Sequence, residues 1–190
     1  YVVLKIIESD LYGHIDTQER FNTFKKTLNQ NNLDTYNRAF YSFRTHLQTS
    51  EAEKWASIQP PFPGITEIIH SLSRKHLLAI ATSKDIRSVT ILLKKYSLYS
   101  LFDSNNILDK DFAPSKRDHL IRFHQEHSLP FSSMYFIDDK VLHLIRVVDL
   151  GAHCFLAAWG FNSKREEKNA RAHGCHVLSL GDLKSITSKA

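Results

Sequence analysis

The sequence predicts an α/β fold, a doubly wound Rossmann-like parallel sheet with a small helical insertion. Short runs rich in Val, Ile and Leu alternate with helical patterns, which is typical of parallel strands joined by helices. Acidic loops follow two of these runs, at Asp10 and at Asp138-Asp139. Residues 17–59 carry helical patterns only, so they interrupt the alternation once. At 190 residues, the chain has the length of one ordinary domain with a small insertion.

The N-terminal part begins with an expected strand. Residues 2–9 are almost continuously apolar, as in a strand that is buried on both faces. Asp16-Thr-Gln-Glu19 has the spacing of a capping box and predicts a helix start. A second amphipathic helix is expected over 36–47, and the Pro-rich segment 60–64 ends the insertion. We therefore expect a core of residues 1–16 and 60–190, with 17–59 as a small helical cap.

The remainder of the chain alternates regularly between the two patterns. Glycine at position 151 is placed to end a helix, and right-handed crossovers are expected between the parallel strands. The expected helices cover 65–73, 86–96, 117–125, 141–148 and 163–172, and the expected strands cover 77–81, 106–108, 134–137, 153–157 and 177–178.

Composition narrows the class of protein. The net charge is +5, but the Lys and Arg residues are scattered along the chain, so a nucleic-acid partner is not expected. A small anionic substrate is expected instead, because it matches a modestly basic protein. Cys154 and Cys175 lack metal-ligand spacing and are interpreted as idle or buried thiols. No apolar run approaches the length of a membrane span, and the start is too short for a signal peptide. A cytoplasmic protein is therefore expected, and the oligomeric state is left open.

Polar residues gather at the predicted strand ends. Asp10 ends the first strand, Thr82 and Ser83 end the second, and Asp138-Asp139 ends a later one, while Lys116 precedes a helix. Chemistry collects at the carboxyl ends of parallel strands. A carboxylate that attacks phosphorus needs a hydroxyl to hold the phosphoryl oxygens, a cation to offset charge, and an oxygen-lined Mg²⁺ site. The combination therefore predicts a phosphate-handling enzyme.

These segments resemble the haloacid dehalogenase (HAD) superfamily of aspartate-nucleophile hydrolases. Asp10-Leu-Tyr-Gly-His-Ile-Asp-Thr is similar to the first motif of the family, and Ala79-Ile-Ala-Thr-Ser83 to the second. Pro61-Phe-Pro-Gly64 resembles the return from the cap. Ser115-Lys-Arg-Asp-His and the segment from Leu129 to Asp139 look like the magnesium-dependent phosphatase branch, and Ala158-Trp-Gly-Phe161 is similar to phosphoglycolate-phosphatase-like members.

The resemblance implies a role for each matching position. Asp10 would be the nucleophile, would form an aspartyl-phosphate and would also bind Mg²⁺. Thr82, with Ser83 as the substitute, would hold the phosphoryl group, and Lys116 would steady phosphate and nucleophile. The metal shell would comprise Asp139, the second acidic position Asp138 and the backbone carbonyl of Tyr12.

Three positions depart from the family pattern. Tyr12 stands where the phosphatases carry a second Asp as general acid and base, His14 stands where a Thr is expected, and His143 stands at a later acidic position. Loss of a general acid or base typically costs about 10²–10⁴-fold in rate, so reduced activity or a preference for good leaving groups is expected. His14 is either a substitute acid, because its ordinary pKa lies near neutrality, or a packed or solvent-facing histidine.

Two alternatives stay open beside a Mg²⁺-dependent phosphatase acting on a small phosphorylated metabolite. Asp-x-Tyr-Gly is also the first motif of the 2-haloacid dehalogenases, which use no metal and bind the substrate carboxylate through an arginine of the cap. In this chain, Arg38 or Arg44 would take that role. Against it, Asp138 and Asp139 beside Asp10 would repel one another without a cation. The other alternative is a non-catalytic homologue that binds a phosphorylated ligand or a protein, suggested by the three departures.

Overall fold

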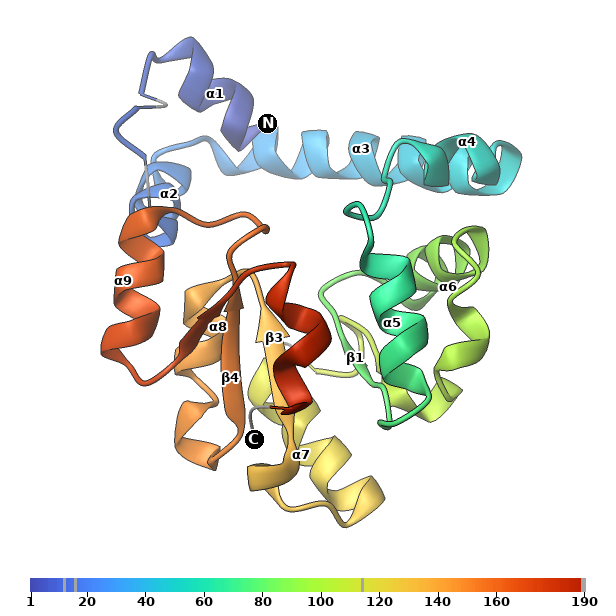
Figure 1. Cartoon of the computed structure of the whole chain (residues 1–190). Coiled ribbons are helices and arrows are strands. Elements are labelled where there is room, and N and C mark those ends of the chain that lie inside the picture. The colour runs from blue at the N-terminus through green and yellow to red at the C-terminus, as the bar shows by residue number, and fades with distance from the viewer. Residues whose placement is uncertain (12, 16, 114, 189–190) are drawn as a thin grey trace. The chain divides into compact units, whose positions relative to one another are not determined.

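The chain forms two compact units, Tyr1–Trp55 and Ala56–Ala190, in a computed structural model that describes residues 1–11, 13–15, 17–113 and 115–188. The boundary after Trp55 lies close to the predicted end of the insertion at 59. That residues 1–16 belong with 60–190 stays a prediction. The helices of the first unit are α1 (Val2–Glu8), α2 (Gln18–Lys26) and α3 (Gln30–Ser50), and α4 (Ala52–Ser57) runs across the boundary (Figure 1).

The predicted first strand is wrong, because residues 2–8 form α1. The N–H of Lys5 donates to the carbonyl of Tyr1 at 2.9 Å, and Lys5 pairs with Glu8 at 2.6 Å, one helical turn away. A short apolar run does not distinguish a strand from a helix by periodicity alone. The described part of the first unit also contains no strand with which this run pairs. Local i to i−4 hydrogen bonds satisfy its backbone instead.

Side-chain caps begin the next two helices of the first unit. The Thr17 hydroxyl accepts from the N–H of Arg20 at 3.2 Å and starts α2 within two residues of the predicted position. Asp16, the other residue of the predicted capping box, lies outside the described residues. Asn29 caps α3 through the N–H of Asn32, and α3 contains the helix predicted for 36–47.

The second unit contains the strands, all paired in parallel. Strands β1 (Ile80–Ala81) and β2 (Ile107–Leu108) form one pair. Strands β3 (Tyr135–Asp138), β4 (His153–Ala157) and β5 (His176–Leu178) form a second sheet in the order β3-β4-β5. The predicted α/β class with parallel strands is confirmed, although the described strands belong to two sheets, and β1 covers only the end of the predicted 77–81.

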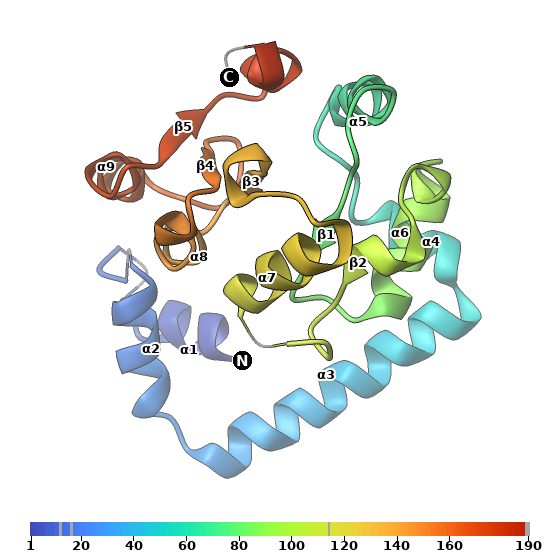
Figure 2. The ribbon, with the colours of Figure 1, turned by 90° about the horizontal axis from the view of Figure 1, so that it is seen from below.

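Helices cover both faces of the three-stranded sheet. The α-helices of the unit are α5 (Ile65–Ser73), α6 (Ile86–Lys95), α7 (Lys116–His127), α8 (Val141–Ile145) and α9 (Lys164–Ala172), and the short 3-10 helices are Tyr99–Leu101, Ser104–Asn106, Phe131–Ser133, Val148–Leu150 and Asp182–Ser188. Figure 2 shows α8 and α9 on one side of β3 and β4, and α5 with the C-terminal 3-10 helix on the other. Strand residues alternate accordingly between two apolar clusters.

The alternation of strand residues places apolar side chains on both faces of the three-stranded sheet. Phe136 of β3 and Cys154 and Leu156 of β4 enter the cluster under α8 and α9. Tyr135 and Phe155 face the cluster under α5. Gly151 has φ +90° and ends the preceding helical turn as predicted.

Among the described residues, no helix combines the length and the apolar character that crossing a membrane requires.

Candidate active site

An open cavity of about 480 Å³ in the second unit collects the residues that follow β1 and β3. Thr82 and Ser83 follow β1, Asp138 ends β3, and Lys116 is the first residue of α7. The full lining comprises Ala81, Thr82, Ser83, Lys84, Lys116, Ile137, Asp138, Asp139, Lys140, His143, Ala157 and Trp159. Thus five of the predicted site residues meet in one cavity, as expected for the ends of parallel strands. Their roles stay predictions.

The other predicted site residues lie elsewhere in the chain. Asp10 and His14 are exposed residues of the first unit, and Tyr12 lies outside the described residues. Asp10 follows α1 with φ +55°, and its N–H donates to the carbonyl of Ile7 at 3.0 Å. Asp10 therefore stands in a turn that terminates a helix, and the prediction that it is the nucleophile stays a prediction.

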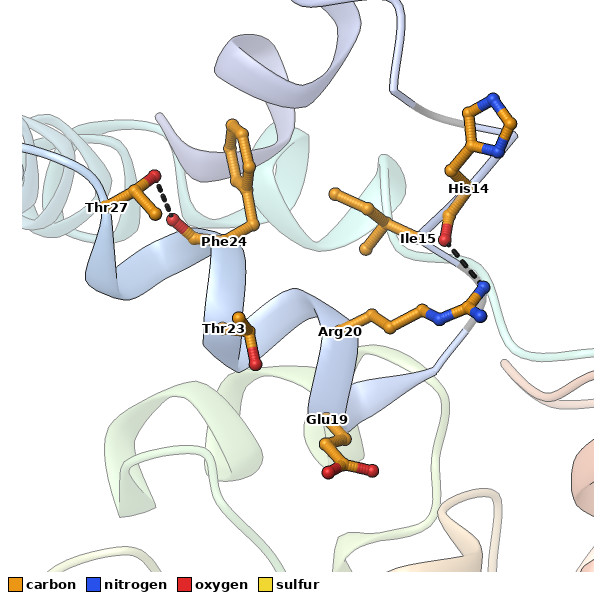
Figure 3. Close-up of a pocket in the computed structure, with 7 residues that line it drawn as sticks. All are labelled: His14, Ile15, Glu19, Arg20, Thr23, Phe24 and Thr27. Atoms are coloured by element: carbon orange, nitrogen blue, oxygen red, sulfur yellow. Dashed lines mark hydrogen bonds between the residues drawn. The ribbon is translucent and has the colours of Figure 1, made fainter.

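His14 lines a cavity of about 520 Å³ within the first unit, beside α2 (Figure 3). Arg20 donates to the backbone carbonyl of His14 at 3.0 Å, so the bond uses the main chain and not the imidazole. The remaining lining residues are Ile15, Glu19, Thr23, Phe24 and Thr27. Among the described residues that line this cavity, none forms a hydrogen bond with the imidazole of His14.

The loop after β1 is held by two local bonds at Thr82. Its N–H donates to the carbonyl of Leu108 at 2.9 Å, which continues the β1–β2 pairing by one residue. Its hydroxyl accepts from the N–H of Lys84 at 3.1 Å, which closes a short turn. Since a hydroxyl that accepts a bond can still donate one, Thr82 retains a proton with which to bind a phosphoryl oxygen. Ser83 is exposed beside it.

Lys116 is nearly buried, with 8% of its surface exposed. Ser115 caps α7 by accepting from the N–H of Asp118 at 3.2 Å, and this cap fixes the backbone immediately before the lysine. Burial lowers the pKa of the Lys116 ammonium, Asp138 opposes that effect, and Lys140 adds to it. A cation kept in the protein despite burial is suited to a ligand that brings negative charge.

Both oxygens of Asp138 are engaged within its own loop. Oδ1 accepts from the N–H of Lys140 at 2.8 Å, and Oδ2 lies 2.9 Å from Nδ1 of His143. An ionised carboxylate only accepts, so Nδ1 of His143 is the donor. Asp138 therefore ties the end of β3 to the start of α8.

Asp139 is held differently from its neighbour. Oδ2 accepts a hydrogen bond of 3.0 Å from the N–H of Phe161, which lies in the loop that follows β4. Within the described part of the chain, Oδ1 of Asp139 accepts no hydrogen bond. Of the two carboxylates, Asp139 is therefore the one with an oxygen that accepts no hydrogen bond from the described residues.

The donor set suits a hard cation without enclosing one. Among the described residues, no group of three or more His, Cys, Asp or Glu side chains is placed to hold a metal. The cavity offers the carboxylates of Asp138 and Asp139. Mg²⁺ is usually bound through one or two carboxylates together with water and substrate phosphate, so the donors present fit Mg²⁺.

The cavity also contains residues that were not predicted as site residues, among them Lys84, Lys140, His143 and Trp159. Lys84 and Lys140 follow predicted positions directly, so their proximity in sequence was an available signal. The bond from His143 to Asp138 spans five residues of a loop and a helix start, and no sequence pattern specifies it. Trp159 belongs to the segment that resembles phosphoglycolate-phosphatase-like members.

Comparison with known proteins places most of the chain in one family. The model of a family described as haloacid dehalogenase-like hydrolase matches residues 6–145. Magnesium-dependent phosphatase 1 from Homo sapiens is 30% identical over 105 residues, which cover 55% of this chain and 57% of that protein. The chain thus matches little more than half the length of this curated relative.

Two solved structures share the fold. A haloacid dehalogenase-like family hydrolase from Streptococcus pneumoniae superposes with a TM-score of 0.67 at 20% identity, over 89% of this chain and 75% of that one. A predicted phosphatase from Clostridium acetobutylicum gives a TM-score of 0.58 at 23% identity, over 68% of this chain and 60% of that one. At such identities the likeness shows the α/β fold.

Proposed function

Because this chain belongs to the haloacid dehalogenase-like hydrolase family and is therefore a hydrolase, we propose that it is a Mg²⁺-dependent phosphatase that acts on a small phosphorylated metabolite. The observation that carries the proposal is the single cavity that joins Thr82, Lys116, Asp138 and Asp139. A hydroxyl, a buried ammonium and two carboxylates are the groups that phosphoryl transfer requires. The relative named a magnesium-dependent phosphatase supports the same chemistry.

In the proposed reaction, the Asp10 carboxylate attacks phosphorus and forms a new bond to it while the bond from phosphorus to the leaving group breaks. An acyl or aryl leaving group then departs as its anion and takes up no proton in this step. The Thr82 hydroxyl, with Ser83 beside it, donates to a phosphoryl oxygen, and the Lys116 ammonium offsets the phosphoryl charge. Water then attacks the aspartyl-phosphate, releases phosphate and regenerates Asp10. Mg²⁺ would be held by Asp139 and, as the family resemblance implies, by Asp10 and the backbone carbonyl of Tyr12, and it would supply further charge neutralisation. Asp138 supports this set from the same loop.

Tyr12 limits the substrates that we propose. An unperturbed Tyr has a pKa near 10, so it is a poor proton donor to the leaving group at neutral pH. Phosphates whose leaving groups depart without protonation, such as acyl or aryl phosphates, avoid that deficiency. We therefore propose that turnover of such substrates exceeds that of simple alkyl phosphates.

The test is release of phosphate from para-nitrophenyl phosphate and acetyl phosphate, with and without Mg²⁺. We expect release that needs Mg²⁺ and that is lost in Asp10→Asn, a nearly isosteric change that removes the nucleophilic charge. No release from either substrate would overturn the phosphatase proposal. Turnover of 2-chloropropionate without metal would then indicate a dehalogenase, and inactivity on all three would indicate a binding protein.

A further inference from the structure

We propose that Gly160 is a positioning residue for Asp139, and that the loop after β4 thereby determines which carboxylate oxygen is left for Mg²⁺. The inference rests on the proposed function. It concerns residues 158–162, which connect β4 to the cap of α9. A Cβ added at Gly160 would lie 2.2 Å from Cβ of Asp139 and 3.1 Å from both its Cγ and Oδ2. The two loops are in contact with no room for even one methyl group.

Gly160 is not required by its own backbone. The glycines with positive φ among the described residues are Gly64, Gly151 and Gly174, and Gly160 is not one of them. A left-handed φ is therefore not what requires glycine at position 160, and the space taken up by Asp139 is what excludes a side chain. Carbon atoms in contact normally lie about 3.5–4.0 Å apart. Since the added Cβ would lie 2.2 Å from Cβ of Asp139, relieving the clash requires a shift of roughly 1.3–1.8 Å.

The close approach has a direct consequence for the carboxylate. It allows the N–H of Phe161 to donate to Oδ2 of Asp139 at 3.0 Å. Oδ2 is thereby fixed against the loop, whereas Oδ1 accepts no hydrogen bond from residues that the structure describes. Mg²⁺ demands near-ideal octahedral geometry. Fixing one oxygen therefore orients the other before the ion arrives.

The loop is braced so that it resists displacement. The N–H of Gly160 and the side-chain amide of Asn162 both donate to the carbonyl of Ala157, at 2.9 and 2.8 Å. The N–H of Ala158 donates to the carbonyl of Leu178 at 2.9 Å and ties the loop to β5. Because these bonds hold the loop on β4 and β5, the strain of an added methyl group falls on Asp139.

The experiment compares Gly160→Ala with Gly181→Ala in the full chain. Gly181 is a matched control, because its φ is also outside the positive region and an added Cβ would make only an ordinary contact of 3.8 Å with the Ser179 hydroxyl. Mg²⁺ binding is measured by calorimetric titration, with Asp139→Asn as the control for loss of the ligand. Circular dichroism and thermal melting without metal report whether each variant folds.

We expect Gly160→Ala to weaken Mg²⁺ binding by about 10–100-fold, as displacement of a group supporting a metal ligand typically does, while Gly181→Ala binds like the wild type. If Gly160→Ala does not fold, Asn162→Ala removes one brace of the same loop without adding atoms, and it should also weaken binding. Unchanged Mg²⁺ affinity in the folded variant would overturn this inference alone. Failure of the wild type to bind Mg²⁺ would overturn the proposed function and the inference together.

Discussion

At the scale of single residues, Lys116 shows a conflict between stability and function. Burial lowers the pKa of its ammonium from the ordinary 10.5. Between the lowered pKa and 10.5 the folded protein binds fewer protons than the unfolded chain, so this lysine makes the free energy of unfolding rise with pH. Below that window the buried charge is a net cost to folding. Its retention in the cavity is therefore expected to serve a ligand.

Lys116→Met tests this conflict, because methionine fills a similar volume without charge. We expect unfolding in urea at pH 7 to require at least as much denaturant as in the wild type. That advantage should shrink as the pH approaches 10.5, where the wild-type lysine loses its proton in both states. Phosphate release should fall by about 10²-fold or more, as loss of a group that stabilises developing charge typically does. Unchanged phosphate release in Lys116→Met would show that Lys116 does not take part in the reaction.

His143 stabilises the loop after β3 through its hydrogen bond to Asp138. Its Nδ1 donates to Asp138 at 2.9 Å, and Asp138 is the more buried of the pair, with 12% of its side chain exposed. His143→Leu should lower the free energy of unfolding by about 1–3 kcal/mol, because a partly buried carboxylate loses its donor. His143→Asn should recover much of the loss, since the amide nitrogen of Asn stands near the place of Nδ1. Urea denaturation measures both, and equal losses would argue that packing, not the bond, is what the histidine supplies.

At the scale of elements, two helix caps allow a loss of stability to be distinguished from a loss of side-chain positioning in the cavity. Ser115 caps α7 immediately before Lys116, and Ser163 caps α9 through the N–H of Glu166, away from the cavity. Each Ser→Ala change should cost about 1 kcal/mol. Ser115→Ala should reduce kcat/KM for para-nitrophenyl phosphate by more than Ser163→Ala does, because the Ser115 cap directly precedes the cavity residue Lys116. Equal kinetic effects from both variants would mean that general loosening, and not the start of α7, limits activity.

The elements that could be predicted are those whose pattern has a single interpretation. Strand β4 and helix α5 have the predicted bounds, because turn residues flank each segment: Gly151 precedes β4, and Gly64 precedes α5. The strand predicted for residues 2–9 was wrong, because an apolar run of that length suits a helix as well as a strand. In the site, strand ends placed Thr82 and Asp139 in one cavity. The close contact of Gly160 with Asp139 joins two loops whose separation no local pattern encodes.

At the scale of the whole molecule, the core of the second unit contains two thiols that serve as reporters of its opening. Cys154 and Cys175 belong to the apolar cluster under α8 and α9, with 2% and 4% of their surface exposed. Burial raises the pKa of the Cys154 thiol to about 12, to which Cys175 contributes, and burial also raises the pKa of Cys175. The reactive species is the thiolate, so both thiols should be inert in the folded protein at pH 8.

Labelling with a thiol-reactive disulfide reagent tests that expectation, since the second unit must open before either sulfur reacts. Native protein should show almost no labelling within minutes, and protein in concentrated guanidinium should show both thiols. Leu156→Ala creates a cavity in the same cluster, where Leu156 is fully buried, and should cost about 2–5 kcal/mol. Native labelling should therefore accelerate in Leu156→Ala by a factor that tracks its loss of free energy of unfolding. Rapid labelling of the wild type, unaffected by this substitution, would mean that the sulfurs are reached without opening the cluster.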